Sequence, residues 1–261
     1  PPDPEMDSMI GSQVLGRYRV VRPLARGGMG VVYLGRIEGA EGFSKPVVIK
    51  QILPQLTAEK ETREQFVREA RILSDLHHPN IVTVLDFGVA RDTYVMVLEY
   101  VHGYSLAHWF QYLIEQEQTL DPECSILVCI RILDALAHAH EYVDDQGVPA
   151  AVIHRDVSPG NVMLDIEGGV KLLDFGIARQ TSSKEHRIAT ESGTVKGKFS
   201  YVAPEIYRGA TASPRSDLYA VGVVLYQLLS GANPFRCDDA RATMNRVLDY
   251  VPPPLSALRD D

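Results

Sequence analysis

The spacing of the apolar residues changes along this chain of 261 residues, and the change limits what the chain can fold into. Residues 17–24, 31–36 and 46–51 are rich in β-branched residues and alternate between apolar and polar side chains. Such alternation is typical of strands that bury one face of a sheet. Later segments repeat their apolar residues at the spacing of a helix. We therefore expect an α+β protein with two lobes, in which an antiparallel sheet precedes a mostly helical part.

The first lobe should also contain one main helix and two further strands. Four apolar residues recur at helical spacing and would share one face of this helix: Phe66, Ala70, Leu73 and Leu76. The helix should end before Pro79, because proline cannot continue the helical hydrogen bonds. Residues 82–87 and 94–98 are predicted to be strands that complete the sheet. Residues 99–103 are then expected to connect the lobes.

Domain boundaries follow from these patterns. The start, PPDPEMDS, is proline-rich and acidic, so residues 1–15 are expected to be a disordered lead-in. Residues 16–101 would form the first lobe and residues 102–261 the second. No segment shows the order of basic, apolar and small residues that marks a signal peptide.

Two long helices are expected in the second lobe. Residues 120–142 carry apolar side chains at helical intervals: Ile126, Ile130, Leu133 and Ala137. The apolar run at residues 220–229 includes Gly222 and Gln227 and is shorter than the roughly 20 residues that a membrane span requires. We expect a buried helix there, and no membrane span in this chain.

The composition is that of an ordinary globular protein, with 45% hydrophobic and 23% charged residues. The formal net charge of -8 argues against nucleic acid as a partner, because the average field repels a phosphate polyanion. The three cysteines, Cys124, Cys129 and Cys237, form no CxxC pair and no even-numbered framework. A reducing, cytoplasmic setting is the simplest account of them.

Two short motifs carry oxygen ligands suited to metal-bound phosphates. The first is HRDVSPGN, from His154 to Asn161, and the second is DFG, which begins at Asp174. Asp156 could orient and deprotonate a hydroxyl group, while Asn161 and Asp174 offer hard oxygen ligands to Mg²⁺. The tripeptides HRD and DFG can each arise by chance in a loop, but both together in this order and spacing are much rarer. Together they indicate phosphoryl transfer from a nucleotide.

With these motifs the chain resembles a protein kinase domain, and within that family the eukaryotic-like (Hanks-type) serine/threonine kinases of bacteria. GGMGVVYLG, HRDVSPGNV and LLDFGIAR carry the resemblance, which runs from about Arg17 to the end of the chain. It implies a bilobal kinase fold with ATP and Mg²⁺ bound between the lobes. It also implies transfer of the γ-phosphate to Ser or Thr hydroxyls of a protein substrate, which the sequence does not identify.

The segment ARGGMGVVY, residues 25–33, corresponds to the loop that covers the phosphates in this family. Glycine lets the backbone approach oxyanions closely and point its amides at them, although a glycine-rich turn between strands is also typical of an ordinary hairpin. The resemblance implies these nucleotide-binding positions: Ala25, Gly27, Gly28, Gly30 and Val32. Ala25 replaces the family's first glycine, at a position where glycine is expected to allow a positive φ, so we expect a slightly stiffer loop that still binds nucleotide.

VVIK at residues 47–50 resembles the family's VAIK motif, whose lysine reaches the α- and β-phosphates of ATP. Lys50 takes that role by the resemblance, and Glu69 in FVREA would hold it extended through an ion pair. Val48 replaces the usual alanine and enlarges one wall of the adenine pocket. The remaining adenine contacts implied by the resemblance are Val32, Leu98, Glu99, Val101 and Met163.

Two positions near Asp156 depart from the family's pattern. The family usually has lysine two residues after the catalytic aspartate, where this chain has Ser158, whose neutral hydroxyl cannot supply that charge. In GKFSYVAPE, Lys198 replaces the family's threonine. Our hypothesis is that Lys198 reaches back beside Ser158 and replaces the missing ammonium group near Asp156. The alternative is a lysine that faces solvent from a loop.

The segment after DFG is expected to carry regulation. Thr194 aligns with the family's usual phosphorylation site, and Thr190 and Ser192 are near alternatives. A phosphate there would add a charge of about -1.5 to -2 and pair with Arg155 and Lys171. We expect partial activation by autophosphorylation at Thr194. The alternative is an unmodified polar loop.

Two features of the second lobe complete the comparison with the family. Asp217 should brace the catalytic loop by accepting backbone hydrogen bonds. After a helix near residues 239–250, the family continues with two further helices, which carry the arginine that pairs with Glu205 and which this chain is expected to lack. Apolar surface of the second lobe would then be uncovered. Either the natural protein is longer, or a protein partner or oligomer contact covers this surface.

The same sequence is compatible with two other functions. A pseudokinase would use the fold as a nucleotide-binding or protein-binding scaffold, and the departures at Ala25 and Ser158 favour it. The complete set of catalytic side chains favours chemistry, because a scaffold has no need of them. A metabolite phosphotransferase of related architecture is disfavoured by the peptide-docking APE segment at residues 203–205.

Overall fold

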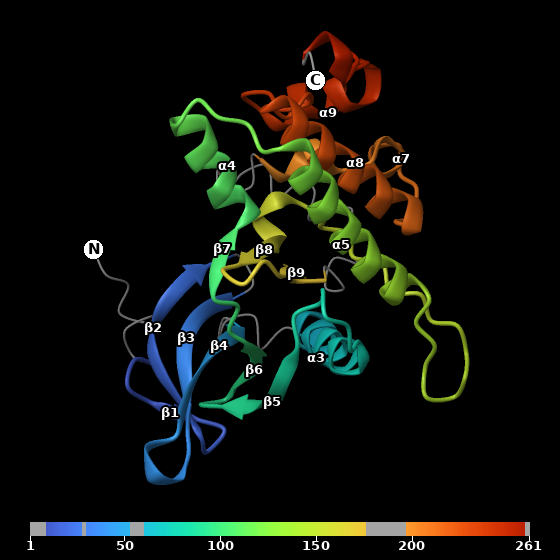
Figure 1. Ribbon diagram of the computed structural model, residues 1–261. Coiled ribbons are helices and arrows are strands. Elements are labelled where there is room, and N and C mark those ends of the chain that lie inside the picture. The colour runs from blue at the N-terminus through green and yellow to red at the C-terminus, as the bar shows by residue number, and fades with distance from the viewer. Residues whose placement is uncertain (1–8, 28–29, 53–59, 176–196, 259–261) are drawn as a thin grey trace. The chain divides into compact units, whose positions relative to one another are not determined.

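The computed structural model describes residues 9–27, 30–52, 60–175 and 197–258. The chain divides into two compact units (Figure 1). Unit 1 comprises Pro1–His77 and Val82–Tyr100, and unit 2 comprises His78–Ile81 and Val101–Asp261. The short segment at residues 78–81 belongs to unit 2, in which the Leu172 amide donates to the Asn80 carbonyl over 2.8 Å.

Unit 1 is an antiparallel six-stranded sheet in the order β1-β2-β3-β4-β6-β5, together with one main helix. Its elements are β1 (Gln13–Val14), β2 (Tyr18–Arg26), β3 (Gly30–Glu38), the 3₁₀ turn η1 (Ala40–Gly42), β4 (Ser44–Ile52), α3 (Lys60–Asp75), β5 (Val84–Ala90) and β6 (Thr93–Glu99). Phe66, Ala70 and Leu73 are buried along α3, as their spacing predicted. The expected sheet and main helix are confirmed.

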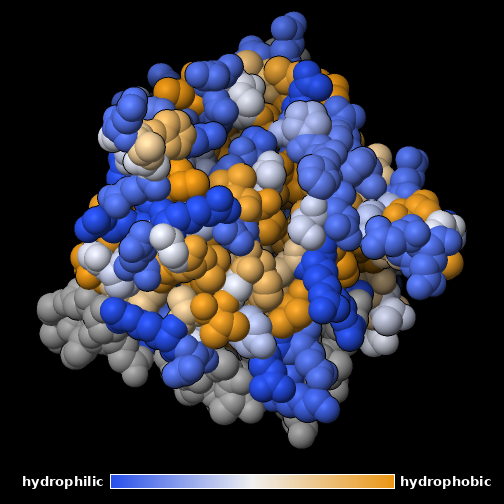
Figure 2. All heavy atoms as spheres, turned by 90° about the horizontal axis from the view of Figure 1, so that it is seen from below, coloured by the Kyte–Doolittle hydropathy of each residue, from blue (hydrophilic) through white to orange (hydrophobic). Residues whose placement is uncertain are grey.

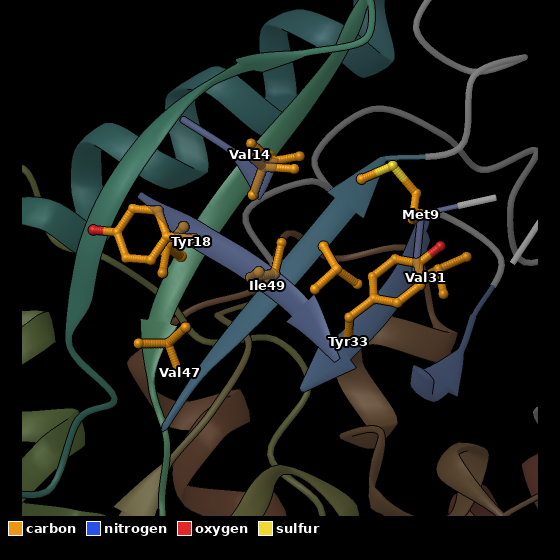
Figure 3. Close-up of a cluster of buried hydrophobic side chains, with 10 residues drawn as sticks. Met9, Val14, Tyr18, Val31, Tyr33, Val47 and Ile49 are labelled. Carbon is orange, nitrogen blue, oxygen red and sulfur yellow. The ribbon is translucent and has the colours of Figure 1, made fainter. Parts of the chain in front are cut away.

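A cluster of buried side chains packs on this sheet, and it includes the N-terminal segment (Figure 3). Met9 and Val14 are 3% and 2% exposed, and β1 pairs with β2. The expected disordered lead-in, residues 1–15, is therefore corrected for residues 9–15, while residues 1–8 lie outside the described part. Met9 and Val14 follow the proline-rich, acidic residues 1–8, and their apolar side chains gain free energy by burial against the sheet.

Unit 2 is mostly helical and contains a small three-stranded sheet in the order β7-β8-β9. Its elements are β7 (Gly103–Ser105), α4 (Leu106–Glu115), α5 (Pro122–His140), η2 (Pro159–Asn161), β8 (Val162–Asp165), β9 (Val170–Leu172), η5 (Lys198–Tyr201), α7 (Pro204–Tyr207), α8 (Pro214–Ser230), α9 (Ala240–Asp249) and η6 (Leu255–Ala257). The helical second lobe is confirmed.

Local sequence explains where α8 begins and ends. Ser213 and Ser216 form a capping box at its first turn, and Pro214 occupies a position that needs no amide donor. Gly231 ends the helix with a φ of 78°, a left-handed conformation that glycine adopts at little cost. The expected buried helix at residues 220–229 is therefore present, as part of α8.

α5 forms where a helix was expected, but the residues that indicated it lie on the exposed side. Ile126, Ile130 and Leu133 are 48%, 45% and 37% exposed. The buried side carries Ile132 and Leu136, and α5 packs against α8. Both sides of this helix are apolar, so the spacing of the residues could not reveal which side would be buried.

Apolar side chains also reach the surface elsewhere. Figure 2 shows hydrophobic residues among hydrophilic ones on the face that it presents, and Phe43 and Val89 of unit 1 are 59% and 56% exposed. Scattered exposure of this kind is normal for a globular protein. Within the described ranges, no helix has the length and apolar character that a bilayer crossing requires.

Candidate functional site

Asp217, in the first turn of α8, holds the loop that carries the HRD motif. Its Oδ2 accepts a hydrogen bond from the backbone N of His154 and its Oδ1 accepts one from the backbone N of Arg155, both over 2.8 Å. His140 places Nε2 2.8 Å from the same Oδ2. The expected bracing role of Asp217 is confirmed. His140, which ends α5, is a partner that no signal in the sequence marked.

The imidazole of His154 is fully buried and bonded at both nitrogens. The backbone N of Asp156 donates to Nδ1 over 3.2 Å, and Nε2 lies 2.9 Å from the carbonyl oxygen of Leu173. A ring that accepts at Nδ1 and donates at Nε2 is neutral, and burial lowers the pKa of His154 below its usual value of 6.5. Its centroid lies 4.6 Å from that of Phe175, so His154 connects the HRD and DFG motifs.

Three predicted site residues, Asp156, Asn161 and Lys198, meet at one carboxylate oxygen. The Lys198 Nζ lies 2.6 Å from the Asp156 Oδ2. The Asn161 Nδ2 donates to the same oxygen over 2.9 Å and to the Asp156 carbonyl over 2.8 Å. The Asp156 side chain is 11% exposed and that of Lys198 is 39% exposed. A carboxylate held in this way can receive the hydroxyl proton of a bound substrate.

Two polar atoms of residues that flank Asp156 in the sequence are buried without a hydrogen-bond partner among the described residues: the Ser158 Oγ and the Arg155 Nε. Ser158 is 3% exposed and precedes the turn η2. Arg155 has a left-handed φ of 66°, and burial lowers its pKa, although Asp217 opposes that effect. The Ser158 position is thus an enclosed, neutral one.

The two expected metal ligands belong to unit 2. Asn161 turns its Nδ2 toward Asp156, which leaves its Oδ1 as the atom available to a cation. Asp174 has a left-handed φ of 48°, an uncommon conformation that sets the direction of its side chain. The described residues contain no group of three or more His, Cys, Asp or Glu that could hold a metal. Two protein oxygens still suit Mg²⁺, which usually completes its shell with water and substrate phosphates.

Unit 1 places the expected nucleotide-binding residues on neighbouring strands. Val32 lies opposite Lys50, and Val48 lies opposite Leu98. Ala25 pairs with Val32 in the β2–β3 hairpin and does not have a positive φ. The Ala25 methyl group therefore causes no backbone strain, which corrects the expectation based on a glycine position.

The glycines of this hairpin differ in what they require. A Cβ on Gly30 would lie 2.2 Å from the carbonyl oxygen of Gln51, so the close approach of β4 leaves no room for a side chain at this position. A Cβ on Gly27 would meet nothing within 4 Å, and the Gly27 amide donates to the Gly30 carbonyl over 2.9 Å. In β6, the Glu99 carboxylate accepts a hydrogen bond from the Thr83 amide over 2.8 Å.

The other expected contacts divide between unit 2 and the part outside the description. Val101 is 8% exposed, and Met163 lies in β8 opposite Ser105 and Lys171. Five expected features lie outside the described residues: Gly28, Thr190, Ser192, Thr194 and the side chain of Glu69.

Comparison with known families gives this geometry its context. The profile described as "Protein kinase domain" matches residues 18–254. The chain belongs to the protein kinase family. The kinase resemblance and the kinase fold expected from the sequence are thereby confirmed.

Several bacterial kinases are similar to this kinase chain. The serine/threonine-protein kinase pkn3 of Myxococcus xanthus is 38% identical over 99% of the chain, and PrkC of Bacillus subtilis (strain 168) is 36% identical over 89%. The tyrosine-protein kinase MasK of Myxococcus xanthus (strain DK1622) is 38% identical over 95%. The chain spans only 46%, 33% and 38% of these three relatives.

Solved kinase structures resemble this one as well. The kinase domain of Mycobacterium tuberculosis PknI has a TM-score of 0.65 and 30% sequence identity, covering 96% of this chain and 85% of that one. A second structure of that domain gives a TM-score of 0.66 over 95% of this chain and 83% of that one. At this identity the likeness supports the bacterial kinase assignment as well as the fold.

Proposed function

We propose that this chain is a serine/threonine protein kinase, which transfers the γ-phosphate of ATP to Ser or Thr hydroxyls of a protein. The observation that carries this proposal is the Asp156 carboxylate, which is 11% exposed and bonded to Asn161, on a loop held by Asp217. Family membership and the named relatives support it. A cytoplasmic setting fits the three free thiols of Cys124, Cys129 and Cys237.

The transfer itself requires few groups. The substrate oxygen forms a bond to the γ-phosphorus while the bond from that phosphorus to the bridging oxygen of ADP breaks. Asp156 accepts the hydroxyl proton, and the two hydrogen bonds from Asn161 keep it oriented. Bound Mg²⁺ would offset the charge of the phosphates. The Asn161 Oδ1 and the Asp174 carboxylate would hold that ion.

The nucleotide contacts are part of the same proposal. Lys50 would bind the α- and β-phosphates, with Glu69 as its ion-pair partner. The phosphate-covering backbone would come from Ala25, Gly27, Gly28 and Gly30. The adenine ring would contact Val32, Val48, Leu98, Glu99, Val101 and Met163. The pairing of Val32 in β3 with Lys50 in β4 supports this assignment for unit 1.

Autophosphorylation is proposed for the segment after DFG, at Thr194, with Thr190 and Ser192 as alternatives. Arg155 supports it, because a cation whose Nε is buried without a hydrogen-bond partner among the described residues gains from a nearby anion. Mapping phosphopeptides after incubation with Mg-ATP tests the site. Unreduced activity of an unphosphorylated Thr194→Ala variant would refute the regulatory role.

The transfer is tested by incubating the purified chain with Mg-ATP and measuring phosphate incorporation by mass spectrometry. Asp156→Ala should reduce incorporation by at least about 100-fold, because the base is lost. Asp134→Ala is the matched control, since it removes a 47%-exposed carboxylate from α5. Incorporation that is equal in the wild type and Asp156→Ala would refute the proposal. ATP binding without incorporation by the wild type would indicate the scaffold function, which the kinase relatives do not favour.

A further inference from the structure

The ion pair between Lys198 and Asp156 places a cation at the point where the proposed chemistry occurs. The Nζ to Oδ2 distance is 2.6 Å, and this is the oxygen that Asn161 also contacts. Ser158, two residues after Asp156 along the same loop, is 3% exposed and neutral. The positive charge next to this carboxylate comes from Lys198 in η5, which lies 42 residues further along the chain.

The turn that presents Lys198 is fixed on both sides of that residue. The Ser200 Oγ donates to the Gly197 carbonyl over 3.0 Å, and the Asn233 Nδ2 donates to the Ser200 Oγ over 2.9 Å. The Tyr207 hydroxyl donates to the Phe199 carbonyl over 2.6 Å. Ser200 is only 1% exposed, so these bonds are shielded from water. Lys198 is therefore directed toward Asp156 by an anchored backbone and does not extend from a free loop.

We propose that Lys198 is a catalytic residue, which supplies the positive charge for the transferring phosphoryl group. The inference rests on the proposed kinase function. The phosphoryl group carries charge on three equatorial oxygens during transfer, and a cation positioned beforehand stabilises that charge. An ammonium group already in contact with the base lies next to the hydroxyl that attacks. Its three donors allow it to keep Asp156 while it bonds to a phosphoryl oxygen.

The location of this cation has a consequence for control of the enzyme. Lys198 belongs to the turn that leads into α7, whereas Asp156 and Asn161 belong to the loop held by Asp217. Base and cation are thus contributed by two elements with separate anchors. A displacement of η5 alone would remove the cation while the base and the metal ligands stay in place.

The first experiment separates chemistry from binding. Lys198→Met should lower the single-turnover rate of phosphate transfer by about 100-fold, as expected for loss of one electrostatic contact to the transition state. Its dissociation constant for Mg-ATP, measured by calorimetry, should change by less than about threefold. Lys198→Arg keeps the charge and should retain at least a tenth of the rate. Lys45→Met is the matched control, because Lys45 is exposed and forms no ion pair among the described residues.

The second experiment moves the cation. Lys198→Thr combined with Ser158→Lys should recover at least tenfold in rate over Lys198→Thr alone, and Ser158→Ala should remain active. A purely structural lysine would not be rescued from another position. Transfer by Lys198→Met at the wild-type rate overturns the proposal, as does a folded double variant that recovers nothing. Absence of transfer by the wild type would instead refute the proposed function.

Discussion

At the scale of single residues, Asp217 shows how one buried carboxylate sets a loop. It receives hydrogen bonds from the backbone of His154 and Arg155 and contacts the His140 ring, and it is 2% exposed. Arg155 has a positive φ, which costs free energy unless the surroundings impose it. The two backbone hydrogen bonds to Asp217 provide that constraint.

Asp217→Asn should lower the free energy of unfolding by about 2–4 kcal/mol, because the amide presents a donor to a position surrounded by donors. The measurement is urea unfolding followed by fluorescence of the only tryptophan, Trp109, which lies in unit 2. Asp121→Asn is the control: Asp121 caps α5 at the surface, and Asn caps a helix equally well. Equal stability of the two variants would contradict this account.

At the scale of elements, the N-terminal segment forms only because unit 1 offers it a surface. β1 has two residues, too few to be stable without support. The Gly11 amide donates to the Val20 carbonyl over 2.8 Å, and the Val20 amide donates to the Ser12 carbonyl over 2.9 Å. Met9 then buries its side chain in the cluster shown in Figure 3.

Met9→Ala should destabilise unit 1 by about 2–4 kcal/mol, as expected for truncating a buried methionine. The neighbouring Ile10 is 42% exposed, so Ile10→Ala should cost less than about 1 kcal/mol. Because Trp109 reports on unit 2, hydrogen exchange of the β2 amides is the suitable measurement. Slow exchange of β2 in Met9→Ala, equal to the wild type, would mean that the segment contributes little.

At the scale of the whole molecule, the groups proposed for catalysis are divided between the two units. Lys50 and the glycine-rich hairpin belong to unit 1, while Asp156, Asn161 and Lys198 belong to unit 2. Burial is the main cause that lowers the pKa values of His154 and His78, which both belong to unit 2. The free energy of unfolding should therefore decrease at acidic pH, and the decrease should come from unit 2.

Below pH 6.5 the unfolded chain protonates the imidazole of His154 while the folded chain keeps it neutral. The unfolded state then binds more protons, so stability is complete above this pH and falls as the pH decreases below it. The slope should approach about 1.4 kcal/mol per pH unit for each such imidazole. His154→Gln should show a shallower decline between pH 6.5 and 5, measured by Trp109 fluorescence. If the wild type and His154→Gln lost stability with equal slopes between pH 6.5 and 5, the assignment would be refuted. Above pH 7, where the imidazole is neutral in both states, the two slopes should be equal.

Much of the fold could be predicted from local sequence. The spacing of apolar residues predicted the buried face of α3 and the buried helix at residues 220–229. α8 begins earlier, at Pro214, where the capping box of Ser213 and Ser216 is a local signal for its start. The candidate site could be predicted in part, because HRD and DFG are short motifs whose residues are close in sequence. Asp217 was also predicted correctly, although only through the resemblance.

The sequence by itself thus determined the element types, the kinase resemblance and the identity of the candidate catalytic side chains, because these depend on neighbouring residues. Only the tertiary structure decided which side of α5 is buried, that Met9 packs on the sheet, and that His140 meets Asp217 across 77 residues. It also decided that Lys198 meets Asp156 across 42 residues. Such contacts depend on how whole elements pack against one another. The spacing of apolar residues within one segment does not reveal which other segment it will pack against.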